Sequence, residues 1–138
     1  MISDLLSGAG GSETWSERLG PGAIVLRGFA TAQAANIVAE IQQIIAQAPF
    51  RHMETPGGFR MSVAMSNCGE LGWVTDKAGY RYQAVDPDSA RPWPSLPTLF
   101  RQLATEAAAQ AGFANFMPDA CLINRYEPGA RMSLHQDK

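Results

Sequence analysis

The sequence predicts one α+β domain in which two helices lie beside short strands. The chain has 138 residues, of which 46% are hydrophobic, which is enough for a single buried core. Two segments repeat apolar residues with a helical period, whereas the remaining apolar runs are short and separated by glycine and proline. This composition argues against a disordered chain. No apolar run approaches the roughly 20 residues of a membrane helix, so we expect no transmembrane segment.

The N-terminal third is expected to hold a strand and the first helix. A flexible opening over about residues 1–20 contains the run SGAGGS at 7–12, and a strand follows over 23–27. The first helix is predicted to start at Thr31 as N-cap and to stop before Pro49. Its buried stripe would be Ala35, Val38, Ile41, Ile45 and Ala48, widened by Ile37 and Ile44.

The middle and the end of the chain are expected to alternate loops, strands and one more helix. Residues 50–97 are rich in glycine, proline and aromatic side chains, with a strand over 61–66. The second helix would run from Pro97 to about residue 111, with Ser95 as N-cap and Gly112 as terminator. Its predicted buried stripe is Leu99, Phe100, Leu103 and Ala107. A strand over 119–126, a turn over 127–130 and a second strand over 131–138 would form a hairpin.

The predicted hairpin gathers polar residues on one face. Its register would place Tyr126 opposite Arg131, Asn124 opposite Ser133 and Leu122 opposite His135. With Asp137, these polar residues share a face, for which an ordinary solvated surface is the alternative. His135 and Asp137 lie two residues apart, so their nitrogen and oxygen donors could reach one metal ion. They would supply two of the three ligands of a two-histidine, one-carboxylate site, and an HxD tripeptide alone is weak evidence for it.

The charge, the second histidine and the cysteines limit the partners, metal ligands and disulfides that can be expected. The formal net charge of −2 gives no overall attraction to nucleic acid or to anionic lipid. His52 is expected to be an exposed loop residue, because nothing in its spacing ties it to the HxD segment, and Arg131 to be a solvated strand arginine. Cys68 and Cys121 are expected to be free thiols in a reducing, cytoplasmic setting.

Longer motifs carry a more specific signal. The segments TPGGFRMSVAMSNCGELGWVT, PDACLINRY and NRYEPGARMSLHQDK closely resemble the bacterial AlkB family of Fe(II)- and 2-oxoglutarate-dependent DNA dealkylases. The resemblance covers roughly residues 21–138. It implies that His135 and Asp137 bind iron and that Asn124 and Tyr126 bind 2-oxoglutarate. Trp73 would stack on the flipped damaged base, with His135 on the opposite side of that base.

The resemblance also implies contacts with the nucleic acid. Tyr80 would contact the DNA backbone, and Thr55 would lie beside the nucleotide. Ordinary core burial is the alternative for Trp73. Further backbone contacts could come from four basic side chains that are otherwise ordinary surface charges, namely Arg51, Arg60, Lys77 and Arg81.

For the whole enzyme, the resemblance implies a double-stranded β-helix (jelly-roll) core flanked by helices. Residues 50–97 would form a nucleotide-recognition lid, and residues 98–138 a helix and the start of the catalytic sheet. The reaction would be oxidative removal of N-methyl groups, as in 1-methyladenine and 3-methylcytosine, with O2 consumed and formaldehyde and succinate released. Partners would be alkylated DNA, single strands preferred, with RNA left open, and with no membrane and no obligate protein partner.

This sequence also departs from the family. The family's second iron-binding histidine and its 2-oxoglutarate-binding arginine have no counterpart here. We therefore expect an N-terminal fragment that is inactive by itself and lacks the second half of the jelly roll. Two other interpretations are a catalytically dead nucleotide-binding module and a metal-binding β-protein unrelated to nucleic acid.

Overall fold

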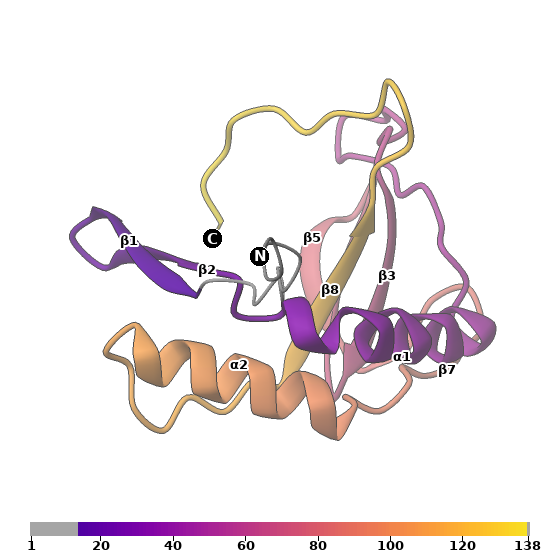
Figure 1. The fold of residues 1–138 in the computed structure, drawn as a ribbon. Coiled ribbons are helices and arrows are strands. Elements are labelled where there is room, and N and C mark those ends of the chain that lie inside the picture. Colours follow the sequence, from indigo (N-terminus) through magenta and orange to yellow (C-terminus); the bar gives the residue numbers. More distant parts are fainter. Residues whose placement is uncertain (1–13, 138) are drawn as a thin grey trace, which may run out of the picture.

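The computed structural model describes residues 14–137, and it confirms the predicted α+β class (Figure 1). None of its described helices is both long enough and apolar enough to cross a membrane. In chain order the elements are β1 Trp15–Gly20, β2 Ala23–Arg27, the 3-10 helix η1 Thr31–Gln33, α1 Ala34–Gln47, β3 Ala64–Gly69, β4 Gly72–Asp76, β5 Gly79–Gln83, β6 Val85–Asp86, β7 Arg91–Pro92, α2 Thr98–Gln110 and β8 Ala120–Arg125.

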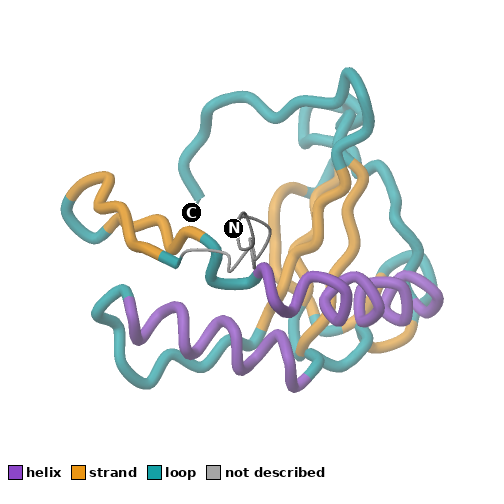
Figure 2. The backbone as a smooth tube through the Cα atoms, viewed as in Figure 1, coloured by secondary structure: helices purple, strands orange, loops and turns teal. Residues whose placement is uncertain are grey.

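The strands pair two by two, and each pair is antiparallel: β1 with β2, β3 with β8, β4 with β5 and β6 with β7. The β3–β8 pair joins segments far apart in the sequence, with Ala64 opposite Arg125 and Gly69 opposite Ala120. Both helices lie on one side of this pair (Figure 2). Ile44 of α1 and Phe100 of α2 pack there against Cys68 and Ile123. The helices therefore cover one face of β3–β8.

A second apolar cluster lies where the chain before β3 meets β4 and the segment after β7. Its buried members include Met53, Val63, Met65, Val74 and Trp93. Trp93 packs so closely against Gly72 that a Cβ at that glycine would overlap the indole ring. This contact fixes the start of the β4–β5 hairpin against the core.

Both predicted helices are confirmed, but their starts and their buried faces differ from the prediction. Thr31 begins the 3-10 turn, and Gln33 is the N-cap of α1. Ile44 and Ala48 are buried while Val38 is exposed, because α1 turns its Ile37–Ile41–Ile44 line toward the sheet. Every residue of the stripe predicted for α2 is only half-buried.

Of the two predictions for the ends of α2, the N-cap is wrong and the C-terminal glycine is correct. Pro97, not Ser95, is the N-cap, and its carbonyl accepts the first helical hydrogen bond, from the Arg101 amide at 3.1 Å. At the other end Gly112 takes the left-handed conformation, with φ of +94°. The amide of Phe113 donates to the Ala108 carbonyl at 2.8 Å, which completes a Schellman-type ending. The predicted terminator is thus confirmed.

The predicted C-terminal hairpin is wrong. The 119–126 strand exists as β8 and the 127–130 turn forms, with the Ala130 amide donating to the Glu127 carbonyl at 2.9 Å. Residues 131–137 form no strand, however, and β8 pairs with β3 instead. In Figure 1 the yellow C-terminal segment leaves β8 and does not return along it. The strand expected over 61–66 is found at Ala64–Gly69 instead. Its bounds are those of the residues that pair with β8.

Near the N-terminus the strand over 23–27 is confirmed as β2. Part of the expected flexible opening is a strand as well, because Trp15–Gly20 pairs with β2 around a turn at Gly22, whose φ is +69°. The run at 7–12 lies outside the described residues.

Candidate nucleotide and metal site

An aromatic pair stands on the β4–β5 hairpin. The register places Trp73 opposite Tyr82 and Thr75 opposite Tyr80, so all four side chains share one face and Trp73 is diagonal to Tyr80. The Trp73 and Tyr80 rings stack with centroids 5.6 Å apart and planes 23° from parallel. Trp73 is half-buried on the second apolar cluster, whereas Tyr80 is 62% exposed. Such a pair offers a flat aromatic surface on which a base could stack.

The HxD segment brings two metal-binding groups together. The His135 Nε2 atom lies 3.3 Å from Asp137 Oδ1, and His135 Nδ1 lies 2.8 Å from the Ser133 carbonyl oxygen. A carbonyl can only accept, so Nδ1 is the donor in this contact. This is the arrangement of a metal-ligating histidine whose other nitrogen donates to the backbone. The side chains are 52% and 99% exposed, so solvent reaches both donors.

These two donors fit part of an Fe(II) site. An imidazole nitrogen and a carboxylate oxygen are two of the three protein ligands that non-haem iron takes, and here the two atoms lie 3.3 Å apart. Within residues 14–137 no group of three His, Cys, Asp or Glu side chains is placed to bind a metal ion. The described residues therefore supply an incomplete ligand set. His52 is exposed, as predicted, with Nδ1 3.0 Å from the Met61 carbonyl oxygen.

Asn124 and Tyr126 do not face Ser133 and Arg131, because the predicted hairpin is not formed. Asn124 lies opposite Met65 of β3, and its side chain is exposed. The Tyr126 hydroxyl is 3.9 Å from the sulfur of Met132. Asn124 and Tyr126 still lie two positions apart at the end of β8, on the face that the helices do not cover.

Two contacts tie residues 131 and 132, just before the HxD tripeptide, to the rest of the fold. Met132, three residues before His135, packs against the same apolar cluster as Trp73. The Ser62 hydroxyl donates to the Arg131 carbonyl at 3.0 Å and accepts from the Arg131 amide at 3.1 Å. Ser62 therefore binds the backbone of Arg131. The Arg131 residue is exposed, as predicted, but it does not lie in a strand, so that part of the prediction is wrong. These contacts hold the start of the HxD segment beside the segment that precedes β3.

Thr55 shapes the loop of the TPGG motif. Its hydroxyl accepts from the Phe59 amide at 3.1 Å, and its backbone amide donates to the Phe59 carbonyl at 2.7 Å. The hydroxyl oxygen keeps a lone pair and its hydrogen for another partner. The predicted position of Thr55 beside the nucleotide stays a prediction.

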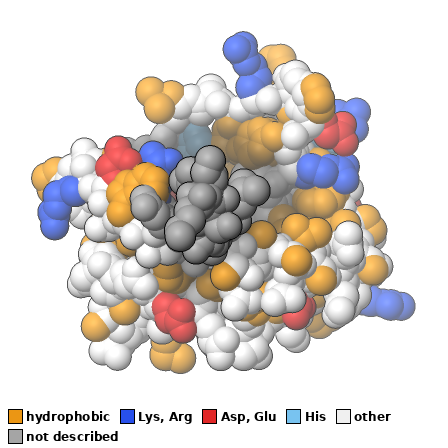
Figure 3. Space-filling view, viewed as in Figure 1, with side chains coloured by type: hydrophobic (Ala, Val, Ile, Leu, Met, Phe, Trp, Pro, Cys, Tyr) orange, Lys and Arg blue, Asp and Glu red, His pale blue; other side chains and the backbone are white. Residues whose placement is uncertain are grey.

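Of the four basic side chains considered for phosphate contacts, two are engaged elsewhere. Arg81 makes two hydrogen bonds to Asp76, at 2.8 and 2.9 Å. The Arg81 hydrogen bond and the Ala78 amide lower the pKa of Asp76, and the same bond to Asp76 raises the pKa of Arg81. Arg60 and Lys77 are exposed, as surface charges are. Lysine and arginine side chains are dispersed over the face drawn in Figure 3, without a continuous basic patch.

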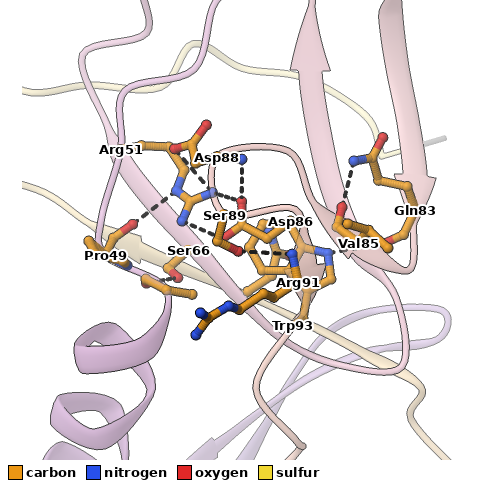
Figure 4. A network of polar contacts seen from close by, with 12 residues as sticks. Pro49, Arg51, Ser66, Gln83, Val85, Asp86, Asp88, Ser89, Arg91 and Trp93 are labelled. Atoms are coloured by element: carbon orange, nitrogen blue, oxygen red, sulfur yellow. Dashed lines mark hydrogen bonds and ion pairs between the residues drawn. The ribbon is translucent and has the colours of Figure 1, made fainter.

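Arg51 is part of a buried network, so both interpretations considered for it, phosphate contact and surface charge, are wrong (Figure 4). Its guanidinium makes paired hydrogen bonds to Asp86, and the two side chains are only 12% and 2% exposed. It also lies 5.1 Å from the centroid of Trp93. Burial opposes ionisation of Asp86. The hydrogen bonds from Arg51 and from the amides of Asp88 and Ser89 outweigh burial and lower its pKa.

Cys68 and Cys121 lie directly opposite each other on β3 and β8, and both are free thiols. The hydrogen bond from Cys68 lowers the pKa of Cys121. The same hydrogen bond, together with burial, raises the pKa of Cys68. Cys121 is thus the more acidic thiol of the pair, and it is also the more accessible one.

Sequence reasoning missed the roles of Asp86, Trp93 and Asn67, which make buried contacts with Arg51, with Gly72 and with the Trp73 backbone. Asp86 and Trp93 lie in a loop-rich stretch without periodicity, and their partners are distant in sequence. Asn67 did offer a signal, because an amide inside a short apolar strand requires buried partners.

Comparison with known proteins connects these features. The profile described as the 2OG-Fe(II) oxygenase superfamily matches residues 22–138. The alpha-ketoglutarate-dependent dioxygenase AlkB of Escherichia coli is 53% identical over 127 residues, which is 92% of this chain and 59% of that protein. The protein of the same name from Salmonella typhimurium is 56% identical over 124 residues, or 90% of this chain and 57% of that protein.

A more distant relative is the alpha-ketoglutarate-dependent dioxygenase AlkB homolog of Caulobacter vibrioides, which is 47% identical over 92 residues. It is matched over 67% of this chain and 40% of its own length. The predicted resemblance to the AlkB family is confirmed by these matches. The chain spans less than three fifths of the length of these relatives.

Proposed function

Because the chain belongs to the 2OG-Fe(II) oxygenase superfamily, we propose that it is part of an Fe(II)- and 2-oxoglutarate-dependent dioxygenase that removes N-methyl groups from DNA bases. The observation that carries the proposal is that Trp73, which stacks with Tyr80, and Met132, three residues before His135, pack against the same apolar cluster. A base-modifying oxygenase requires an aromatic surface for the flipped base and iron ligands near it, and these two contacts with one cluster support that arrangement.

On the iron side, His135 and Asp137 would hold Fe(II), while Asn124 and Tyr126 would donate hydrogen bonds to 2-oxoglutarate. The bound iron with its co-substrate would supply O2 activation, with succinate, carbon dioxide and formaldehyde as products. The bond between His135 Nδ1 and the Ser133 carbonyl keeps Nε2 available as a ligand. Asn124 offers an amide nitrogen as donor and Tyr126 its hydroxyl.

On the substrate side, Trp73 would stack on a base that has left the helix, Tyr80 would contact the backbone, and Thr55 would lie beside the nucleotide. A methyl group that blocks Watson–Crick pairing lowers the cost of extrusion, which is normally a few kcal/mol. Stacking on one aromatic ring returns about 1–3 kcal/mol. Single strands need no extrusion, and this favours them over duplexes.

The fold assignment is part of the same proposal. Residues 50–97 would form the nucleotide-recognition lid, and residues 98–138 a helix and the first part of a jelly-roll catalytic sheet. On the face of β3–β8 that the helices do not cover, the β8 side chains Leu122 and Asn124 are exposed, and this supports the assignment because a closed jelly roll would enclose them.

A second candidate function for this chain is nucleotide binding without catalysis. It is favoured by one contrast: the aromatic pair is fully formed within residues 14–137, whereas the metal ligand set there is incomplete. A chain with these properties would bind methylated DNA and release no formaldehyde.

The test compares this chain with a longer form that continues through the remaining length of the relatives. Anaerobic binding of Fe(II) and 2-oxoglutarate would be measured first, followed by formaldehyde release from a 1-methyladenine oligonucleotide, single-stranded, duplex or RNA. We expect activity in the longer form only, and loss of activity in its His135→Ala variant. Binding without activity in both forms would support the binding module. If neither form binds Fe(II) and 2-oxoglutarate and neither releases formaldehyde, the proposal is contradicted.

A further inference from the structure

The backbone of Trp73 is held by a buried side-chain amide. Asn67, in the middle of β3, is fully buried. Its Nδ2 donates to the Trp73 carbonyl at 2.9 Å, and its Oδ1 accepts from the Trp73 amide at 3.0 Å. One side chain therefore satisfies both polar backbone groups of one residue, as a neighbouring strand would.

The two hydrogen bonds replace strand pairing that is missing on this side of β4. The amide and carbonyl of a strand residue point to the same side, so those of Trp73 point toward Asn67 and away from β5. β3 pairs with β8 and β4 with β5, and no ladder joins β3 to β4. Without the Asn67 amide, both backbone groups of Trp73 would lack this partner.

The neighbouring residue is fixed from another direction. A Cβ at Gly72 would overlap the indole ring of Trp93, whose Nε1 donates to the Gln83 carbonyl at 3.0 Å. The backbone at residues 72 and 73 is thus held by Trp93 and Asn67 together. Fixing the backbone at Trp73 fixes the direction of its Cα–Cβ bond, and the contacts of the ring with the second apolar cluster and with Tyr80 then select its rotamer, which sets the plane of the ring.

We propose that Asn67 is a positioning residue for substrate recognition: its amide sets the Trp73 backbone and thereby the plane on which the methylated base stacks. This inference rests on the proposed function. A binding surface held in place before the ligand arrives loses less conformational entropy on binding. A purely structural role would predict lower stability after substitution without a change at the Trp73 ring.

The test uses Asn67→Ala and Asn67→Asp in the full chain labelled with 5-fluorotryptophan. Asp keeps the size of Asn and the acceptor for the Trp73 amide, but it puts a second acceptor against the Trp73 carbonyl, so the backbone of Trp73 should be displaced on the carbonyl side. Ser66→Ala is the matched control, because Ser66 is equally buried on the same strand and donates to the Ala48 carbonyl, away from Trp73. The Trp73 fluorine signal is assigned as the one lost in Trp73→Phe.

We expect the Trp73 fluorine signal to shift or broaden in both Asn67 variants and to stay unchanged in Ser66→Ala. The preference for a 1-methyladenine single strand over the unmethylated strand should fall about tenfold in Asn67→Ala, within what stacking on one ring provides. A folded Asn67→Ala chain with an unchanged fluorine signal or an unchanged preference would overturn the inference.

Two further outcomes remain informative. If the unsubstituted chain shows no preference for the methylated strand, the proposed function fails, while the fluorine signal still tests the positioning role. If both Asn67 variants fail to fold, hydrogen exchange of the unsubstituted chain tests whether Asn67 holds the Trp73 backbone. The Trp73 amide should exchange as slowly as its hydrogen-bonded neighbours in β4, and fast exchange there would overturn the inference.

Discussion

Asp86→Asn should destabilise the chain strongly, because it leaves Arg51 as a buried cation with a weaker partner. The Asp86 carboxylate accepts paired hydrogen bonds from the guanidinium, and Arg51 also lies over Trp93. An Asn side chain can accept only one of those bonds and turns an NH2 group toward the other donor. The remaining acid, Asp88, is 3.4 Å from Arg51 but mostly exposed.

Removing one partner of a buried ion pair costs about 3–5 kcal/mol. We expect the lower end, about 3 kcal/mol, because Asp88 still offsets part of the Arg51 charge. The measurement is the free energy of unfolding in urea near neutral pH, followed by tryptophan fluorescence. Asp88→Asn is the matched control and should cost about 0–1 kcal/mol, as exposed ion pairs do.

The pH dependence provides a second, independent check. The folded pKa of Asp86 is lowered below its ordinary value of 3.8, so its ionised form is the one that stabilises the fold. The contribution is present above the unfolded-state pKa and is lost as the pH falls through the folded pKa. The gap between wild type and Asp86→Asn should therefore narrow progressively as the pH falls below 3.8 and through the folded pKa of Asp86. A loss under about 1 kcal/mol, or a gap independent of pH, would refute the buried-pair argument.

Three further substitutions test other parts of the structure. Gly72→Ala should cost about 3 kcal/mol in urea unfolding, because its Cβ would displace the Trp93 indole. Cys121 should be alkylated by iodoacetamide before Cys68, and Cys68→Ala should slow that reaction, because the donor that lowers the pKa of Cys121 is lost. Ser62→Ala should speed hydrogen exchange of the backbone amide that it binds at residue 131 about fivefold.

Each of these expectations has a result that contradicts it. Gly57→Ala is the control for Gly72→Ala, since a Cβ there makes only ordinary contacts, and equal losses would show that Trp93 does not matter. Faster alkylation of Cys121 after the Cys68 substitution would reverse the assigned hydrogen-bond direction. Unchanged exchange in Ser62→Ala would mean that the HxD segment is held by Met132 alone.

Local signals predicted the elements of this fold well. The helical period identified α1 and α2, and Gly112 marked the end of α2, since both depend on residues within a few positions of one another. Strand pairing depends on distant residues. The turn at 127–130 follows a strand and suggested a hairpin, yet β8 pairs with β3, more than fifty residues earlier in the chain. The helices explain the difference, because Ile123 and Cys68 bury one shared face under them.

The same distinction applies to the candidate site. His135 and Asp137 could be paired from their spacing alone, and the structure places their donor atoms 3.3 Å apart. The reason given for joining them to Asn124 and Tyr126 was the hairpin, and that reason is wrong. The Arg51–Asp86 pair spans 35 positions in the sequence, and no periodicity connects its members.

The two halves of the proposed site differ in how firmly the described residues hold them. The aromatic half is fixed by buried contacts of Asn67 with the Trp73 backbone and of Trp93 with Gly72, and the Trp73 ring also stacks with the exposed Tyr80. The metal half consists of two exposed side chains on a segment without regular structure, held mainly through Ser62 and Met132. Base recognition should therefore survive in this chain by itself, whereas iron binding should depend on further ligands that complete the donor set.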